Sequence, residues 1–137
     1  MRRYGWLSSR KLLALVPLIF IVAVPAYAKD LAVRRNVDGY TLDVAINQNP
    51  PIMGKNDIRV EIKDSAGKYV VDALVTVNYL MPPMPGMPHM NYTVKALPRN
   101  SGYGATMDLI MKGPWNIAVR ANVAGKQLRM TVLIDVR

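Results

Sequence analysis

The sequence of 137 residues contains no cysteine, one histidine and one glutamate, and each shortage excludes a class of function. Without cysteine there is no disulfide, no thiolate metal site and no cysteine nucleophile. His89 is the single imidazole, and no glycine-flanked serine stands near it, so a Ser-His-Asp arrangement is not expected. No glycine-rich phosphate loop follows a predicted strand. We therefore predict a protein that is not an enzyme and has no small-molecule substrate.

The first 28 residues have the parts of a secretory signal peptide. A basic segment precedes an apolar run over residues 12–24, and Ala26-Tyr27-Ala28 supplies a signal peptidase site. The apolar run is shorter than the ~20 residues of a membrane-spanning helix. This pattern predicts a signal peptide over residues 1–28, cleavage after Ala28 and a periplasmic protein. The alternative is a protein anchored in the inner membrane through an uncleaved N-terminus.

Residues 29–137 have the length of one domain, and their positive charges are scattered rather than clustered. Scattered charge in an exported domain favours solubility and indicates no nucleic-acid partner. Apolar and polar residues alternate with a period of two, and no long segment has a helical period. Strands are predicted at residues 40–46, 58–62, 73–80, 92–97, 103–111, 115–123 and 128–136. We expect an all-β fold, a seven-stranded antiparallel immunoglobulin-like sandwich with Trp115 as a core anchor.

Residues 81–90, Met-Pro-Pro-Met-Pro-Gly-Met-Pro-His-Met, are the segment that most suggests a function. Four methionines recur at every third position, and proline favours polyproline II, which has three residues per turn. This geometry would place the four thioethers on one face beside the imidazole. Thioethers are soft ligands that favour Cu(I), and imidazole also suits copper. The candidate metal ligands are Met81, Met84, Met87, His89 and Met90.

At the level of sequence, it stays open whether this segment binds a metal at all and, if it does, which of its side chains share the ion. Methionine is flexible and polarizable, so the row could pack against the domain surface without binding metal. A turn of polyproline II rises ~9.3 Å, so all four sulfurs cannot share one ion without bending at Gly86. Two or three sulfurs with His89 fit better. Alternatively, the row receives one ligand from elsewhere in the fold or binds a methionine-rich partner. Outside the row, we predict packing roles for Met53, Met107, Met111 and Met130. Met53 lies in a predicted loop and could instead complete a metal site, and Met111, at the end of its predicted strand, is the most ambiguous of the four.

The order of motifs resembles the YtkA-like and FixH-like family of small extracytoplasmic β-sandwich domains. The resemblance rests on Asp-x-x-Gly-Lys at residues 64–68, Met-Pro-x-Met-Pro-Gly-Met at residues 81–87 and Met-x-Gly-Pro-Trp at residues 111–115. It covers about residues 38–136. The resemblance implies an immunoglobulin-like fold and a link to copper, through heavy-metal efflux or the assembly of copper-containing oxidases. It also implies metal ligation by the methionine row and His89, with Trp115 structural.

The function predicted from these observations is a periplasmic protein that binds copper. It would hold Cu(I), with Ag(I) as an alternative ion, through the Met-Pro-rich loop for copper transfer or tolerance. The competing hypothesis is a metal-free interaction module that assists the assembly of a membrane complex. Its partner would be an efflux pump or a copper-containing oxidase.

Overall fold

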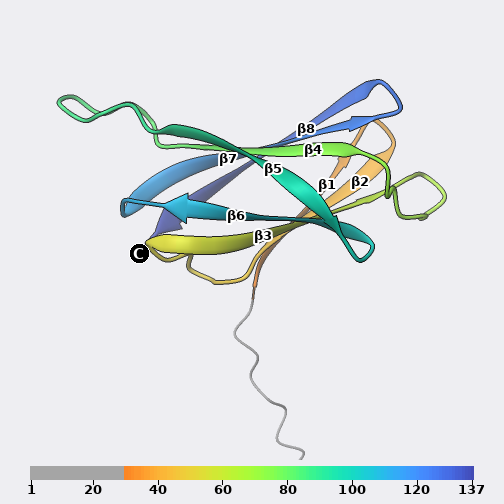
Figure 1. Ribbon diagram of the computed structural model, residues 1–137, viewed down its shortest axis with the longest axis horizontal. Coiled ribbons are helices and arrows are strands. Elements are labelled where there is room, and N and C mark those ends of the chain that lie inside the picture. The colour runs from red at the N-terminus through yellow and green to blue at the C-terminus, as the bar shows by residue number, and fades with distance from the viewer. Residues whose placement is uncertain (1–29) are drawn as a thin grey trace, which may run out of the picture.

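The computed structural model describes residues 30–137, which form eight β-strands and no helix (Figure 1). The strands are β1 (Leu31–Val37), β2 (Tyr40–Ile46), β3 (Gly54–Lys63), β4 (Leu74–Leu80), β5 (Asn91–Arg99), β6 (Gly102–Leu109), β7 (Gly113–Val123) and β8 (Lys126–Val136). Within this part of the chain no helix has the length and hydrophobicity needed to cross a membrane. The predicted signal peptide, its cleavage site and the first residue of the predicted domain lie outside the described residues.

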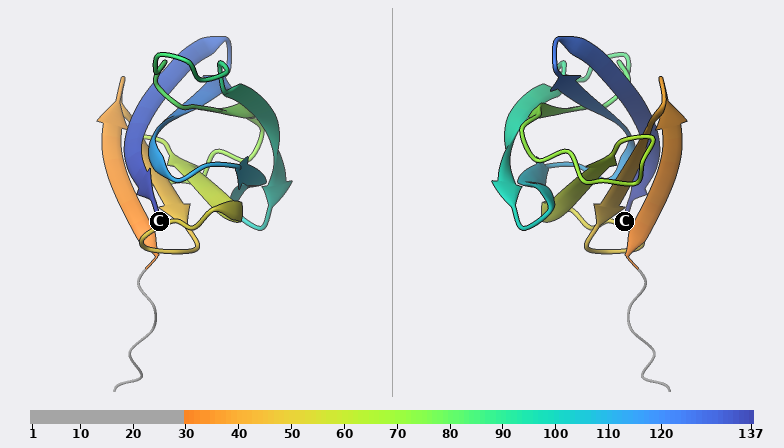
Figure 2. Two further views of the ribbon diagram at one scale, coloured as in Figure 1. Left: turned by 90° about the vertical axis from the view of Figure 1, so that its left-hand side faces the viewer. Right: turned by 90° about the vertical axis from the view of Figure 1, so that its right-hand side faces the viewer.

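All eight strands join one antiparallel sheet in the order β1-β2-β3-β6-β5-β4-β7-β8. β5 connects the two halves of the sheet, because Asn91 to Ala96 pair with β4 and Leu97 to Arg99 pair with β6. The outer strands β1 and β8 approach each other, and Figure 2 shows the sheet curled around a common interior with these two strands side by side. The fold is therefore a nearly closed, barrel-like antiparallel sheet.

The all-β antiparallel prediction is confirmed, but the predicted count of seven strands is wrong. The additional strand is β1, which pairs with β2 along its whole length. Its register places Arg35 opposite the buried Leu42, so an exposed arginine occupies a position that alternation reserves for an apolar residue. A charge at an inward-facing register position of an edge strand also opposes pairing with other chains. The immunoglobulin-like arrangement stays a prediction.

The interior is filled by the alternate residues of each strand, as the period of two predicts. β8 is strictly alternating, with Leu128, Met130, Val132, Ile134 and Val136 all buried. Trp115 and Tyr103 are the largest fully buried side chains, which confirms Trp115 as a core residue. Each fully buried aliphatic side chain, such as Leu128, contributes about 1.5–3 kcal/mol through its removal from water. In a domain without disulfides, this core holds the sheet together.

Every connection in this fold runs between antiparallel strands, so the loops gather at two ends of the barrel. One end holds the start of β1, the β2–β3, β4–β5 and β6–β7 loops, and the C-terminal residue Arg137. We call it the hairpin end, because the β4–β5 loop reaches beyond the neighbouring strands there (Figure 1). Residues 81–90 are that loop.

Candidate metal centre

The Met-Pro row folds into a hairpin whose two ends lie in the core. Met81 and Met90 follow the last rung of the β4–β5 ladder, and the Met81 N–H donates to the Met90 carbonyl oxygen at 3.0 Å. Their side chains are only 3% and 6% exposed. The Met81 Cε atom lies 3.6 Å from the position that a Cβ atom would take on Gly113. These two methionines therefore anchor the hairpin.

The other two methionines flank the tip of the hairpin. The Met87 N–H donates to the Met84 carbonyl oxygen at 3.1 Å, which closes a four-residue turn. Pro85 takes the second position and Gly86 the third with a φ of 76°, as a type II turn requires. Met84 and Met87 are 41% and 39% exposed. The turn thus places two solvent-exposed methionines at its two ends, whose Cα atoms lie within about 7 Å of each other in such a turn.

The hairpin differs from the expected polyproline II helix. Gly86 reverses the chain, and the pairing of Met81 with Met90 closes the loop at its base. The four sulfurs are divided between core and solvent instead of lining one face. His89 is exposed and lies next to the anchoring Met90, on the returning side of the loop. The structure thus groups the five predicted ligands into a buried pair, an exposed pair and an exposed imidazole.

Aromatic and amide side chains support the base of the hairpin. The ring of Tyr79 lies 5.4 Å from that of Tyr92 and 6.1 Å from that of Trp115, measured between centroids. On the outer face, the Asn78 side-chain amide donates to Asn91 Oδ1 at 2.6 Å and to the Tyr92 carbonyl oxygen at 3.0 Å. These contacts tie β4 to β5 immediately below the loop. The tip is therefore carried on a well-supported base.

The chemistry that the hairpin offers is soft and neutral. Residues 81–90 contain no acidic or basic side chain other than His89. Among the described residues, no group of three or more His, Cys, Asp or Glu side chains is placed to hold a metal ion. A hard cation such as Mg²⁺ or Ca²⁺ needs oxygen ligands, whereas thioethers and imidazole suit Cu(I). The side chains of the hairpin are accordingly suited to a soft monovalent ion.

The sequence contains patterns that indicate which of the four methionines are buried and which are exposed. Met81 continues the inward alternation of Val75, Val77 and Tyr79, and Met90 precedes Tyr92 in the same phase on β5. The segment Met-Pro-Gly-Met carries proline and glycine at the two central positions of a type II turn. Taken together, these two patterns predict a hairpin with a buried base and an exposed tip.

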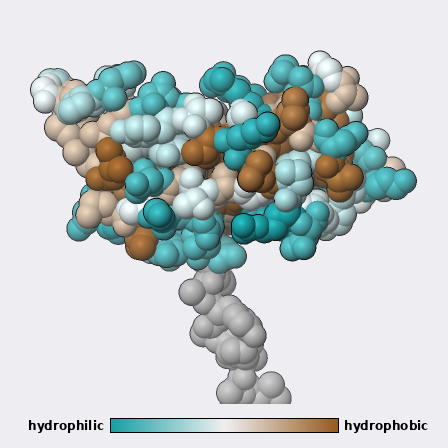
Figure 3. Space-filling view, viewed as in Figure 1, coloured by the Kyte–Doolittle hydropathy of each residue, from teal (hydrophilic) through white to brown (hydrophobic). Residues whose placement is uncertain are grey.

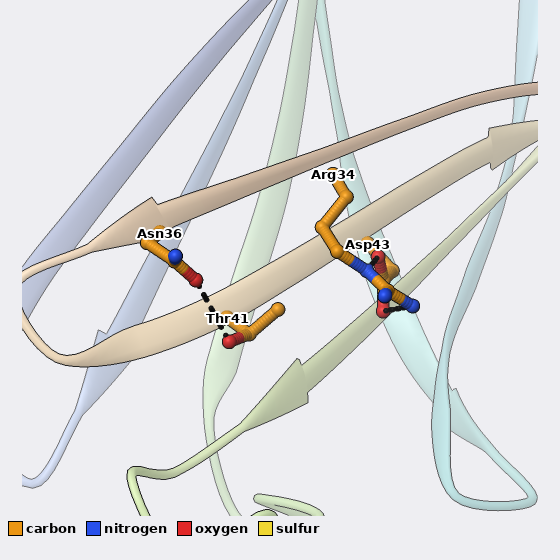
Figure 4. Close-up of polar contacts among 4 residues, drawn as sticks. All are labelled: Arg34, Asn36, Thr41 and Asp43. Atoms are coloured by element: carbon orange, nitrogen blue, oxygen red, sulfur yellow. Dashed lines mark hydrogen bonds and ion pairs between the residues drawn. The ribbon is translucent and has the colours of Figure 1, made fainter.

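A hollow of about 450 Å³ on the outer face of β1, β2 and β3 was not predicted. It is lined by Ala32, Val33, Arg34, Asp43, Val44, Ala45, Arg59 and Glu61. Arg34 donates to both carboxylate oxygens of Asp43, and this hydrogen bonding, with the charge of Asp43, raises the pKa of Arg34 above its ordinary value (Figure 4). Arg59 Nε donates to Glu61 at 3.0 Å. Both carboxylates of the hollow are thus paired with arginine.

Fold and hairpin define the class of protein: a small antiparallel β-domain that presents methionine on a proline-rich hairpin. The model of the YtkA-like family matches residues 34–120, a span that contains the whole hairpin and Trp115. The chain therefore belongs to the YtkA-like family, which confirms the YtkA-like part of the resemblance found in the sequence.

A solved structure shows a similar fold. It is the crystal structure of the PmoD soluble domain from Methylocystis sp. ATCC 49242 (Rockwell), with a TM-score of 0.54 and 12% sequence identity. The similarity covers 78% of this chain and 98% of that chain. At this identity the likeness concerns the fold alone. No curated protein matches the chain significantly in sequence.

Proposed function

We propose that this protein is a non-catalytic, periplasmic copper-binding protein that holds Cu(I) at the tip of the β4–β5 hairpin and passes it on. The observation that carries the proposal is the Met84–Met87 turn, which presents two exposed thioethers within one four-residue reversal. His89, the single histidine of the sequence, follows Met87 by two residues and would supply a third ligand. Ag(I), which has the same preference for thioethers, is the alternative ion.

The five predicted ligands take two roles in this proposal. Met84, Met87 and His89 are exposed, so an ion reaches them without any change in the core. Met81 and Met90 are buried at the base, and their sulfurs would meet an ion only if the hairpin opened. We assign them the role of holding the tip in place. A site with two or three exposed neutral ligands suits transfer of the ion better than storage.

The test is a competition titration against a chromophoric Cu(I) chelator under anaerobic conditions. The variant Met84→Leu/Met87→Leu removes both exposed sulfurs and keeps the apolar character of the tip. We expect Cu(I) affinity to fall at least about tenfold, which corresponds to about 1.4 kcal/mol. The matched control is Met107→Leu/Met130→Leu, which makes the same chemical change at two buried positions. Unchanged affinity in the tip variant would overturn the ligand assignment.

The second candidate is a metal-free interaction module that assists assembly of a membrane complex, an efflux pump or a copper-containing oxidase. The exposure of Met84 and Met87 between prolines supports it, because a rigid apolar tip also suits protein recognition. Leucine keeps this apolar surface and loses the sulfur. Partner binding that survives Met84→Leu/Met87→Leu, in a protein without measurable Cu(I) affinity, would favour this function over the first.

A further inference from the structure

Three positive charges that are scattered along the sequence lie in one row across the outer face of the sheet. The register pairs Arg129 of β8 directly with Arg120 of β7. Thr76 of β4 lies between Arg120 and Lys95 of β5 and pairs with both. Each of the three basic residues lies between residues of the core-facing phase, and each is exposed. We call Lys95, Arg120 and Arg129 the basic row.

The basic row has no acidic neighbour. Within residues 30–137 no ion pair includes any of its three side chains. The next outward positions on β7 and β8 are uncharged: Ala118, Asn122, Gln127 and Thr131. Residues directly opposite each other on neighbouring strands have Cβ atoms ~4.5–5.5 Å apart, and like charges there are destabilising. The fold itself therefore gives no reason for placing Arg120 opposite Arg129.

Positive charge is in excess on this half of the barrel only. In β4, β5, β7 and β8 the one acidic residue is Asp135, and it pairs with Arg137 at 3.1 Å. β3 in the other half alternates basic and acidic side chains at its outward positions, which are Lys55, Asp57, Arg59, Glu61 and Lys63. The field of the molecule is therefore polarised, with its positive side over β4, β5, β7 and β8.

Exposed leucines flank the basic row on both sides. Leu133 of β8 is 77% exposed and lies toward the hairpin end. Leu74 of β4 and Leu97 of β5 are 64% and 61% exposed and lie on the other side of the row. The leucines stand apart from one another, and Figure 3 likewise shows apolar side chains scattered among hydrophilic ones on the face that it draws. They add single apolar contacts to a surface that is mainly charged.

We propose that the outer face of β4, β5, β7 and β8 docks on an anionic phospholipid surface. The basic row would contact the phosphates, and the leucines would reach toward the acyl chains. Long flexible cations and single leucines suit a fluid lipid layer, whereas a protein partner requires side chains that are held in place. This inference does not depend on copper. Because β4 and β5 run on into the hairpin, the hairpin would then extend along the lipid surface (Figure 1).

The test is co-sedimentation with vesicles of phosphatidylcholine, alone or mixed with phosphatidylglycerol. Every protein is produced from the full-length gene, so the N-terminal segment is the same in all of them. We expect the native protein to bind the anionic vesicles, and Arg120→Gln/Arg129→Gln to bind them at least about tenfold more weakly. Raising the salt concentration should release the native protein, because salt screens the attraction. Equal binding of the native protein and this variant would overturn the proposal.

The matched control is Lys55→Gln/Lys68→Gln. It removes the same amount of charge from two exposed positions outside the face, and its binding should stay close to that of the native protein. Equal losses in control and row variant would mean that net charge, not the face, controls binding, and would overturn the proposal. Failure of the native protein to bind anionic vesicles, with retention on immobilised polyglutamate, would instead assign the face to an acidic protein.

A stability measurement checks that the row serves binding rather than folding. Arg120→Gln removes one of two like charges that lie opposite each other, so the free energy of unfolding should stay the same or rise. Chemical denaturation measures it. A marked loss of stability in Arg120→Gln would show that the fold needs this arginine, and it would overturn the inference from the unpaired row.

Discussion

The base and the tip of the hairpin place the same side chain in different surroundings. The base holds Met81 and Met90, and the tip is flanked by Met84 and Met87. The two methionines at the base are nearly inaccessible to water and belong to the main hydrophobic core. The tip pair is about two-fifths exposed and contributes little buried area. In one ten-residue segment, the same residue type thus serves packing at two positions and is available for ligand binding at two others.

The difference follows from strand register and turn chemistry. β4 and β5 place every second residue inward, and the register carries that alternation one residue past each strand, to Met81 and Met90. Beyond this point the prolines end the ladder, because they supply no N–H. The turn at Pro85-Gly86 then fixes where the chain reverses. The predictions below test this division between base and tip, beginning with the largest effect.

Removing a base methionine should destabilise the whole domain. Met81→Ala and Met90→Ala each delete a buried side chain and leave a cavity, at a cost of about 2–5 kcal/mol. Met84→Ala should stay within about 0.5 kcal/mol, since the tip is exposed. Chemical denaturation of the three variants measures the comparison. Equal losses at base and tip would mean that the hairpin base is not part of the core.

Asn56→Ala should have the next largest effect, about 2 kcal/mol. The substitution leaves the Ile52 N–H and the Ile52 and Gly54 carbonyl groups without their partner, and an unpaired buried group costs ~1–3 kcal/mol. Amide hydrogen exchange should accelerate at the Ile52 N–H and leave the Met87 N–H in the hairpin unchanged. Faster exchange at both positions would show that the two loops are not held independently.

Most of the fold could be predicted from the alternation of residues, and its limits have identifiable causes. Ile58, Val60 and Ile62 alternate cleanly with polar residues, and β3 forms there. β1 escaped prediction because Arg35 occupies an inward position. The near-closure of the sheet depends on β5 changing partners after Ala96, a tertiary event that no local pattern records.

The local shape predicted for the candidate segment, residues 81–90, was wrong. The proline content and the three-residue spacing of the methionines favoured polyproline II. The pairing of β4 with β5 on either side instead closes the segment into a hairpin. Met111 was assigned to packing from the apolar phase of its predicted strand, and it is half-buried against the core, whereas Met53 is 52% exposed.

Gly86→Ala should cost about 1 kcal/mol and act on the tip alone. Gly86 has a φ of 76°, and no atom lies within 4 Å of the position that a Cβ atom would take, so the cost is conformational rather than steric. A shifted turn separates Met84 from Met87, and we expect weaker Cu(I) binding. Gly67→Ala is the matched control, with a φ of 77°, open surroundings and a place at the opposite end. Equal Cu(I) affinity in the two variants would show that the turn does not shape the site.

Met84→Leu/Met87→Leu should change the stability of the protein least, although it should change the Cu(I) affinity most. Met84→Leu/Met87→Leu keeps the apolar character and the approximate volume of two exposed side chains, so unfolding free energy should change by less than about 0.5 kcal/mol. Without metal, the melting temperature should match that of the native protein. With Cu(I) added, the native protein should gain stability by ligand linkage and the variant should not. A variant that is already destabilised without metal would place the tip in the core as well, and the division between base and tip would fail.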